Sequence, residues 1–376
     1  MTDRVIQIAA EVVARAERGQ PADAVLREVL RGQHGLSRPD AREISREVFR
    51  YFRWRGWLDR AEPMERQFGL CRELAERFAQ RPESFSDDEL ARAVPDWIWE
   101  EMEVTPAWLR SLQHEPRLWL RAKKGQGGAL AQKLGECWIS DDPALADAVE
   151  YLGGEDLFRS PEFHAGEFEV QDVSSQIAGL LCDPNPGETW WDACAGEGGK
   201  TLHLSDLMEN QGLIWASDRA EWRLKRLKLR AARAKCFNYR AAAWDGGTKL
   251  PTKTKFDGVL VDAPCSGVGT WQRNPHARWT TTAEDVRELA EVQQRLLAHV
   301  APAVKPGGRL LYAVCTLARA ETGEVVMAFN AAQPEFEPMP LHFGKGSLVP
   351  TAATLTLRPQ ATGGNGMFVA AWRRRG

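Results

Sequence analysis

The sequence predicts an α/β fold with a doubly wound, mostly parallel sheet, preceded by an all-α segment and a small α+β connector. Apolar residues recur at helical spacing through residues 1–80, and prolines and glycines break residues 81–165 into short elements. From about residue 166, strand-like apolar runs alternate with helix patterns. We therefore expect three domains, at residues 1–80, 81–165 and 166–376.

The N-terminal segment contains a helix with a clear start. Ser37 is followed three residues later by Asp40, a pair typical of helix N-termini, and Ile44, Val48 and Phe52 then recur every four residues. Two interpretations of its second face are open: a solvated face of a small bundle, or an RNA-contacting surface, since guanidinium groups pair with phosphates and stack on bases. The arginines of that face are Arg42, Arg46, Arg50 and Arg53.

The connector and the C-terminal part give a series of expected elements. In the connector, residues 118–122 and 137–140 are expected to be strands with a helix at 129–134 between them. The repeated strand–helix units that follow imply parallel strands with ligands at their carboxyl ends, and a last antiparallel edge strand. The expected strands are 189–193, 213–217, 238–243, 256–262, 309–314 and 367–372, and the expected helices are 200–208, 221–235, 283–304 and 320–330.

Composition is that of an ordinary globular protein: 43% of the 376 residues are hydrophobic and 27% are charged. No run approaches the roughly 20 apolar residues of a membrane span, and the first ten residues lack the apolar core of a signal peptide. The seven cysteines show no metal-binding spacing, so we expect reduced thiols in the cytoplasm, with no metal and no membrane partner. Nothing in the sequence demands more than a monomer.

Charge is segregated along the chain although the net charge is only −3. Residues 219–240 hold nine Lys and Arg against one acid, Glu221. The expected helix in this stretch also has an apolar stripe. It is therefore either a solvated outer helix or a patch that binds RNA phosphates.

A glycine-rich turn, Asp-Ala-Cys-Ala-Gly-Glu-Gly-Gly-Lys-Thr, occupies residues 192–201 between a strand and a helix. Its glycines allow close approach to a ligand, but the spacing matches neither a P-loop nor the dinucleotide fingerprint. Asp218 and Asp245 follow the next two strands, where carboxylates would hold ribose hydroxyls and an adenine amino group. This pattern fits a cofactor without phosphates and favours S-adenosylmethionine over NAD or ATP; the alternative is a set of ordinary turn residues.

Two cysteines end apolar runs near this turn, Cys265 in Asp262-Ala-Pro-Cys-Ser-Gly and Cys315 in Val314-Cys-Thr. A thiolate that adds to C6 of cytosine makes the ring an enamine, whose C5 can attack a sulfonium methyl group. The C5 proton must then leave and the thiol be expelled, so one cysteine can attack while another residue assists release. Asp262 is placed to hydrogen-bond the N3 edge of the ring. The remaining cysteines are expected to be structural: Cys71, Cys137, Cys182, Cys194 and Cys236.

The order of these motifs resembles the RsmB/Sun family of RNA cytosine-5 methyltransferases. The N-terminal segment resembles, more weakly, the NusB-like helical domain of the bacterial ribosomal-RNA members, notably from Leu36 to Tyr51. The matching C-terminal stretches are Val170-Gln-Asp-Val-Ser-Ser-Gln, the turn at 192–201, Ser217-Asp-Arg-Ala-Glu-Trp-Arg-Leu, Asp245, Asp262-Ala-Pro-Cys-Ser-Gly, Arg273-Asn-Pro, Cys315-Thr and Asn365-Gly-Met-Phe.

The resemblance implies a Rossmann-like S-adenosylmethionine-dependent methyltransferase domain and a role for each motif. Cys315 would be the nucleophile that attacks C6, and Cys265 would help to resolve the adduct. Arg273, Asn274 and Pro275 would contact the flipped nucleotide or its phosphates. The cofactor site would be formed by Cys194, Ala195, Gly196, Glu197, Gly198, Gly199, Lys200, Asp218, Arg223, Asp245 and Asp262.

The chain departs from the family pattern at three places. Glu197 stands where the family usually has proline, which implies a looser turn and a carboxylate near the cofactor. Val314 and Thr316 flank Cys315 in place of a small hydroxyl residue and a serine, and both changes are expected to affect activation of the thiol. The Gly-Met-Phe ending at 366–368 replaces a more usual Asp-Gly-Phe-Phe.

From the sequence we expect a cytoplasmic enzyme that uses S-adenosylmethionine to methylate cytosine C5 in structured RNA. Small-subunit ribosomal RNA is favoured as the substrate because of the N-terminal segment. Two alternatives stay open. One is an RNA-binding ribosome-assembly factor with weakened catalysis, which is supported by the departures from the family pattern at Glu197 and Val314. The other is a methyltransferase for transfer RNA.

Overall fold

The structure is a computed structural model that describes residues 3–341 and 352–376. The chain divides into two compact units, each made of two stretches of sequence. The first contains Met1–Pro116 and Gly267–Ala283, and the second contains Arg117–Ser266 and Glu284–Gly376. A segment that follows directly on the Cys265 turn therefore belongs with the N-terminal helices.

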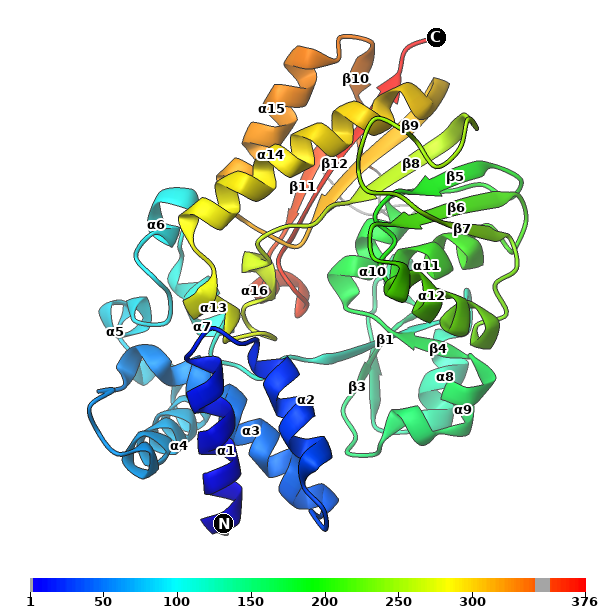
Figure 1. The fold of residues 1–376 in the computed structure, drawn as a ribbon. Helices are drawn as coiled ribbons and strands as arrows, with labels where there is room; N and C mark the ends of the chain where they lie inside the picture. Colours follow the sequence, from blue (N-terminus) through cyan, green and yellow to red (C-terminus); the bar gives the residue numbers. More distant parts are fainter. Residues whose placement is uncertain (1–2, 342–351) are drawn as a thin grey trace. The chain divides into compact units, whose positions relative to one another are not determined.

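The first unit is helical, as its apolar spacing predicts (Figure 1). Ser37 caps α3 by accepting a hydrogen bond from the Asp40 amide at 3.2 Å, and Ile44, Val48 and Phe52 are buried. The helices are α1 (Asp3–Ala16), α2 (Ala22–Gly32), α3 (Arg38–Trp54), α4 (Met64–Gln80), α5 (Asp87–Ala91), α6 (Ile98–Glu101), α7 (Pro106–Ser111) and α13 (Ala277–Thr280), with 3-10 helices η1 (Arg55–Trp57), η2 (Pro82–Ser84) and η5 (Val268–Thr270).

The prediction that Arg53 belongs to an exposed arginine face of α3 is wrong. The helical period places it beside Arg42 and Arg46, but its side chain is buried and donates to the carbonyl of Gln272 at 3.3 Å. Residues 267–283 cover this end of the helix: the Trp279 indole donates to the Phe52 carbonyl at 2.7 Å. A solvated or RNA-contacting role for this face is thus limited to its N-terminal part.

Arg278 holds the 267–283 segment within the helical unit. Its fully buried guanidinium donates to the carbonyls of Trp271 at 3.0 Å and Leu112 at 2.5 Å. Burial, with the nearby charge of Arg53, lowers the pKa of Arg278 well below its usual range. Backbone carbonyls therefore fix a segment that sequence periodicity alone would assign to the C-terminal part.

The second unit contains a small antiparallel sheet in the order β2-β3-β1-β4. The strands expected at 118–122 and near 137 are present, and a helix lies between them. The elements of this part are β1 (Leu118–Ala122), α8 (Gly127–Leu134), β2 (Cys137–Ile139), η3 (Pro143–Leu145), β3 (Ala148–Tyr151), η4 (Leu157–Arg159), α9 (Pro161–Ala165) and β4 (Phe168–Val170).

The larger sheet has the order β10-β12-β9-β8-β5-β6-β7, with β11 also paired to β12. Strands β5 to β9 are mutually parallel, which confirms the doubly wound fold. The elements are α10 (Val173–Leu180), β5 (Thr189–Asp192), α11 (Gly199–Leu207), β6 (Leu213–Asp218), α12 (Glu221–Arg233), β7 (Tyr239–Ala243), β8 (Phe256–Asp262), α14 (Ala283–Val300), η6 (Ala301–Ala303), β9 (Val304–Val314), η7 (Arg319–Glu321), α15 (Gly323–Ala332), β10 (Phe336–Pro338), β11 (Thr354–Leu357), α16 (Pro359–Thr362) and β12 (Met367–Arg374).

The last strand, β12, is antiparallel to β9 as expected, but it is not an edge strand. Both β10 and β11 pair with it, and these strands have only three and four residues. Segments this short give almost no period-two signal, so the sequence does not reveal them. β9 also begins five residues earlier than expected, at Val304, which pairs with Phe256 before an irregularity in the register that ends at Arg309.

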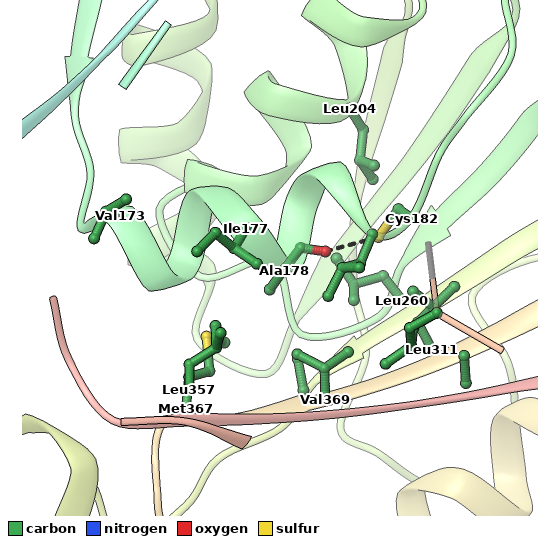
Figure 2. Close-up of a cluster of buried hydrophobic side chains, with 14 of the residues drawn as sticks. Val173, Ile177, Ala178, Cys182, Leu204, Leu260, Leu311, Leu357, Met367 and Val369 are labelled. Atoms are coloured by element: carbon green, nitrogen blue, oxygen red, sulfur yellow. Dashed lines mark hydrogen bonds between the residues drawn. The ribbon is translucent and has the colours of Figure 1, made fainter. Parts of the chain in front are cut away.

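Helices cover both faces of the larger sheet (Figure 1). On one face, α10 and α11 pack Ile177, Leu204 and their neighbours against strand residues such as Leu260 and Leu311 (Figure 2). On the other face, Gln293 of α14 contacts Tyr312 of β9. Burial on both faces leaves the strand ends as the accessible edge of the sheet. Within the described ranges, no helix combines the length and apolar character needed to cross a membrane.

The sheet is closely packed at Gly258 on β8. The ring of buried Trp190 on β5 lies 2.3 to 2.5 Å from the position that a Cβ at Gly258 would take. We expect Gly258→Ala to lower the free energy of unfolding in urea by about 1–3 kcal/mol, because either the ring or the strand must shift. Gly128→Ala is the control: it lies in α8 with no atom within 4 Å of its Cβ position, and alanine favours helices. Equal stability of the two variants would contradict the packing argument.

Candidate active site

The glycine turn joins β5 to α11 and is tied to the end of β6. Gly198 has a φ of +88°, and a Cβ there would lie 2.7 Å from Cγ of Leu227 on α12, so both conformation and packing require glycine. Gly196, with a φ of +55°, donates its amide to Oδ2 of Asp218 at 3.0 Å. The Ala195 amide donates to the Ser217 carbonyl at 2.8 Å.

Asp218 ends β6 beside this turn. Its Oδ1 accepts a second amide hydrogen bond, from Ala220 at 2.8 Å, and the exposed guanidinium of Arg223 lies 3.9 Å from Oδ2. Asp245 follows β7, the strand that pairs with β6. The amide of the preceding residue, Trp244, donates to the Asp218 carbonyl at 3.2 Å, so the ends of the two strands stay together. The Asp245 carboxylate is exposed and accepts from the Gly247 amide at 2.8 Å.

Glu197 is directed toward α12. Its carboxylate pairs with Arg226 at 2.9 Å, and its carbonyl accepts from Arg230 at 3.1 Å. Glu169, which is buried on β4, forms ion pairs with both Arg230 and Arg233. Three cations of the basic helix therefore have acidic partners in their own unit, which favours the solvated-helix interpretation over a phosphate patch.

A buried acidic residue lies under the turn. Asp192 accepts a hydrogen bond from the Thr201 hydroxyl at 2.6 Å on Oδ2, whereas its buried Oδ1 has no hydrogen-bond partner among the residues that the structure describes. Burial raises the pKa of Asp192 to about 7; the Thr201 hydrogen bond opposes this rise, and the charges of Asp262 and Asp218 add to it. Cys194, next in the chain, has its thiol pKa raised by burial and by these acids, which fits a structural role.

Lys200 and Asp262 form an ion pair at the ends of α11 and β8, with Nζ 2.6 Å from Oδ2. Burial of Lys200 disfavours its ammonium form, but the charge and hydrogen bond of Asp262 more than offset this, so the pKa of Lys200 is raised. The Asp262 side chain remains 31% exposed. The pair therefore places one accessible carboxylate at the site with its cation already bound.

The two predicted cysteines are in contact. Cys265 and Cys315 follow the parallel strands β8 and β9, and their Sγ atoms are 3.3 Å apart. The pKa of Cys315 is lowered: the Cys265 hydrogen bond is the main cause, burial opposes it, and of the nearby charges Asp262 and Glu321 raise the pKa while Lys200 lowers it. The arrangement favours Cys315 as a thiolate and Cys265 as the thiol that donates to it.

Sequence reasoning missed a buried network behind the thiols, centred on Glu321 with Gln293 of α14. These residues lie outside every motif quoted above. The available signal was the hydroxyl residue that directly follows each cysteine, Ser266 and Thr316, since buried hydroxyls need hydrogen-bond partners.

The predicted nucleotide contacts lie in the other unit. Arg273 and Asn274 close a turn on the Thr270 carbonyl, at 2.9 and 2.8 Å, and Pro275 follows them before α13. Their role toward a substrate stays a prediction. In the part of the chain that the structure describes, no group of three or more His, Cys, Asp or Glu side chains is placed to hold a metal ion.

Comparison with known proteins identifies solved structures of the same fold. The crystal structure of PH0851 has a TM-score of 0.81 at 22% identity, covering 100% of this chain and 99% of that one. A methyltransferase homolog from Pyrococcus horikoshii has a TM-score of 0.60 at 26% identity, covering 71% of this chain and 90% of that one. NSun6 from Pyrococcus horikoshii, solved with SFG, has a TM-score of 0.61 at 18% identity, over 71% of this chain and 93% of that one.

Curated relatives share more of the sequence. The probable ribosomal RNA small subunit methyltransferase B of Synechocystis sp. is 35% identical over 74% of this chain and 66% of that protein. Its counterpart in Bacillus subtilis is 36% identical over 61% of this chain and 53% of that protein. The ribosomal RNA small subunit methyltransferase B of Pasteurella multocida is 30% identical over 81% of this chain and 71% of that protein.

The matched region thus spans between about half and two thirds of the length of the first two relatives. A sequence model described as 16S rRNA methyltransferase RsmB/F matches residues 179–373, which include the glycine turn, both thiols and the Glu321 network. This confirms the resemblance drawn from the motifs: the chain belongs to the 16S rRNA methyltransferase RsmB/F family.

Proposed function

We propose that this protein transfers a methyl group from S-adenosylmethionine to C5 of a cytosine in RNA, with small-subunit ribosomal RNA as the substrate. The thiol pair supports this most directly: Cys265 and Cys315 lie 3.3 Å apart at neighbouring strand ends, beside an accessible carboxylate. The relatives named ribosomal RNA small subunit methyltransferase B support the substrate class.

The turn residues fit a cofactor that carries no phosphates. Lys200, the one lysine of the turn, is already held by Asp262 at 2.6 Å and is therefore not available as a phosphate anchor. No atom lies within 4 Å of the Cβ position at Gly196, which leaves room beside the turn. Residues 194–200, Asp218, Arg223, Asp245 and Asp262 would hold S-adenosylmethionine, which supplies a sulfonium methyl group when bound.

The chemistry assigned to the chain follows from the contacts of the thiols. The Cys315 thiolate adds to C6 of the cytosine, and the electron pair of the C5–C6 bond moves to C5. Asp262 hydrogen-bonds the N3 edge of the ring, with Lys200 fixing its orientation. C5 then accepts the methyl group. Loss of the C5 proton to water re-forms the C5–C6 double bond as the C6–sulfur bond breaks, and the Cys265 thiol is within reach of the departing Cys315 sulfur and stabilises it by hydrogen bonding.

Glu197 and Val314 depart from the family pattern and suggested weakened catalysis, but their surroundings in the structure are compatible with an active enzyme. Glu197 is paired with Arg226 on α12. Val314 is fully buried at the end of β9, whereas Cys315 after it is partly exposed. Both thiols are present with their sulfurs 3.3 Å apart, so an assembly factor without catalysis is the weaker alternative.

The central test uses tritiated S-adenosylmethionine with unmodified small-subunit ribosomal RNA and, separately, transfer RNA. We expect wild type to label cytosine C5 in the ribosomal RNA. Cys315→Ala should lower the rate at least on the order of 1,000-fold because the nucleophile is lost. Cys265→Ala should instead accumulate a covalent protein–RNA adduct, visible as a shifted band on a denaturing gel, because attack persists and release is slowed.

Cys71→Ala, a buried thiol of the helical unit, is the matched control and should label RNA like wild type. Labelling of transfer RNA alone would show that the substrate is transfer RNA and not ribosomal RNA. RNA binding without any methyl transfer by wild type would replace the enzyme proposal by the assembly-factor alternative.

The thiolate assignment has its own test, independent of RNA. Because the Cys265 hydrogen bond is the main cause that lowers the pKa of Cys315, Cys265→Ala should raise the pH at which Cys315 is half-alkylated in a timed iodoacetamide pulse. A lowered pKa makes the Cys315 thiolate available at lower pH, and loss of the Cys265 donor removes that advantage. Mass spectrometry of the Cys315 peptide gives the midpoint. Cys137→Ala should leave it in place; an unchanged midpoint in Cys265→Ala would refute the assignment.

A further inference from the structure

One buried carboxylate contacts both thiol-bearing turns. Glu321 lies in η7, after β9, and its side chain is fully buried. Its Oε1 accepts the Ser266 amide at 2.9 Å, and its Oε2 accepts the Ser266 hydroxyl. Gln293 of α14 adds a further donor to Oε1 at 2.9 Å. The residue directly after Cys265 is thus held through both its backbone and its side chain.

The same contacts reach the residue directly after Cys315. The Thr316 hydroxyl lies 2.9 Å from the Ser266 hydroxyl, and Thr316 also accepts the Ala318 amide at 3.2 Å. Ser266 gives its hydroxyl proton to Glu321, and the Thr316 hydroxyl also contributes a hydrogen bond that favours the charged Glu321 carboxylate. A chain of hydrogen-bonded groups therefore links Ala318, Thr316 and Ser266 to the Glu321 carboxylate, and the bonds of such a chain reinforce one another in a buried setting.

Gln293 fixes the other side of Cys265. Its second N–H donates to the Pro264 carbonyl at 2.9 Å, while its Oε1 lies 2.8 Å from the Tyr312 hydroxyl. Cys265 is thereby bracketed by held residues at 264 and 266. Burial raises the pKa of Glu321, and the hydrogen bonds from Ser266, Gln293 and Thr316 oppose this rise. The donors are neutral groups, so the carboxylate depends on their geometry.

We propose that Glu321 is a positioning residue that keeps the two thiol-bearing turns in register, so that the sulfurs of Cys265 and Cys315 stay in contact. This inference rests on the proposed function of the thiols. It also accounts for Thr316, which retains the hydroxyl that the network uses although it replaces the usual serine. A shift of about 1 Å between reacting groups can change a rate on the order of 100-fold, which makes such a clamp important for turnover.

The sharpest test compares Thr316→Val with Thr316→Ser. Valine keeps the shape and loses the hydroxyl, whereas serine keeps the hydroxyl, so only the first breaks the chain. We expect Thr316→Val to lower kcat for RNA methylation on the order of 10-fold with an unchanged KM for S-adenosylmethionine, and Thr316→Ser to behave like wild type. Similar kcat values for the two variants would overturn the proposal.

Glu321→Gln tests the carboxylate itself. An amide retains one acceptor oxygen and loses the other, so we expect kcat to fall on the order of 10- to 100-fold. Glu324→Gln is the matched control, because Glu324 lies three residues away, partly exposed and paired with Arg319. The effects of Glu321→Gln and Thr316→Val should be less than additive when combined, since both break the same chain. Full additivity would argue for separate roles.

A second readout reports the register of the turns without activity. Diamide takes two electrons and two protons from a pair of neighbouring thiols and leaves a disulfide. With the sulfurs 3.3 Å apart, wild type should form a Cys265–Cys315 disulfide rapidly, measured by mass spectrometry after timed quenching. Glu321→Gln and Thr316→Val should form it several-fold more slowly, and Glu324→Gln and Thr316→Ser at the wild-type rate.

The two readouts separate the proposals. If wild type transfers no methyl to RNA but the disulfide rate still depends on Glu321 and Thr316, the clamp stands and the proposed function fails. If wild type methylates RNA while both variants keep wild-type kcat and disulfide rate, the clamp is wrong and the proposed function stands.

Discussion

The parallel pairing of β8 with β9 is the constraint on which the site depends. Asp262 lies opposite Ala313 in the register, and the Ala263 amide continues the ladder to the Ala313 carbonyl at 2.9 Å. Because both strands end at the same edge of the sheet, Cys265 and Cys315 leave it side by side. Close packing of Gly258 under Trp190 fixes β8 against β5, so the glycine turn is brought to the same edge.

Charge at this edge is arranged around one buried cation. Asp192, Asp218 and Asp262 surround the turn, and Lys200 is bound to Asp262. Their mutual repulsion and burial raise the pKa of Asp192, while the ion pair preserves the charge of Lys200. The Cys265 hydrogen bond and the charge of Lys200 both lower the pKa of Cys315. The same few groups therefore set the charge both of the proposed cofactor site and of the proposed nucleophile.

Side chains from other segments bear on the alternatives that the sequence left open for two basic helices. The basic helix α12 has the composition of a phosphate-binding surface, yet three of its arginines form ion pairs with Glu197 and Glu169. Arg53 is on the arginine face of α3 by helical period, yet the 267–283 segment buries it. In both cases the local pattern gives the direction of a side chain correctly, whereas its partner comes from elsewhere in the chain.

Features that depend on the local order of residues could be predicted from the sequence. A short apolar run predicted β8 at residues 256–262, the glycine turn indicated the approach of a ligand, and the motifs together indicated the family. Tertiary structure alone decided that β12 lies inside the sheet, that residues 267–283 join the helical unit, and that Glu321 lies behind both thiols. These facts rest on contacts between residues far apart in the chain, which leave no periodic trace in the sequence.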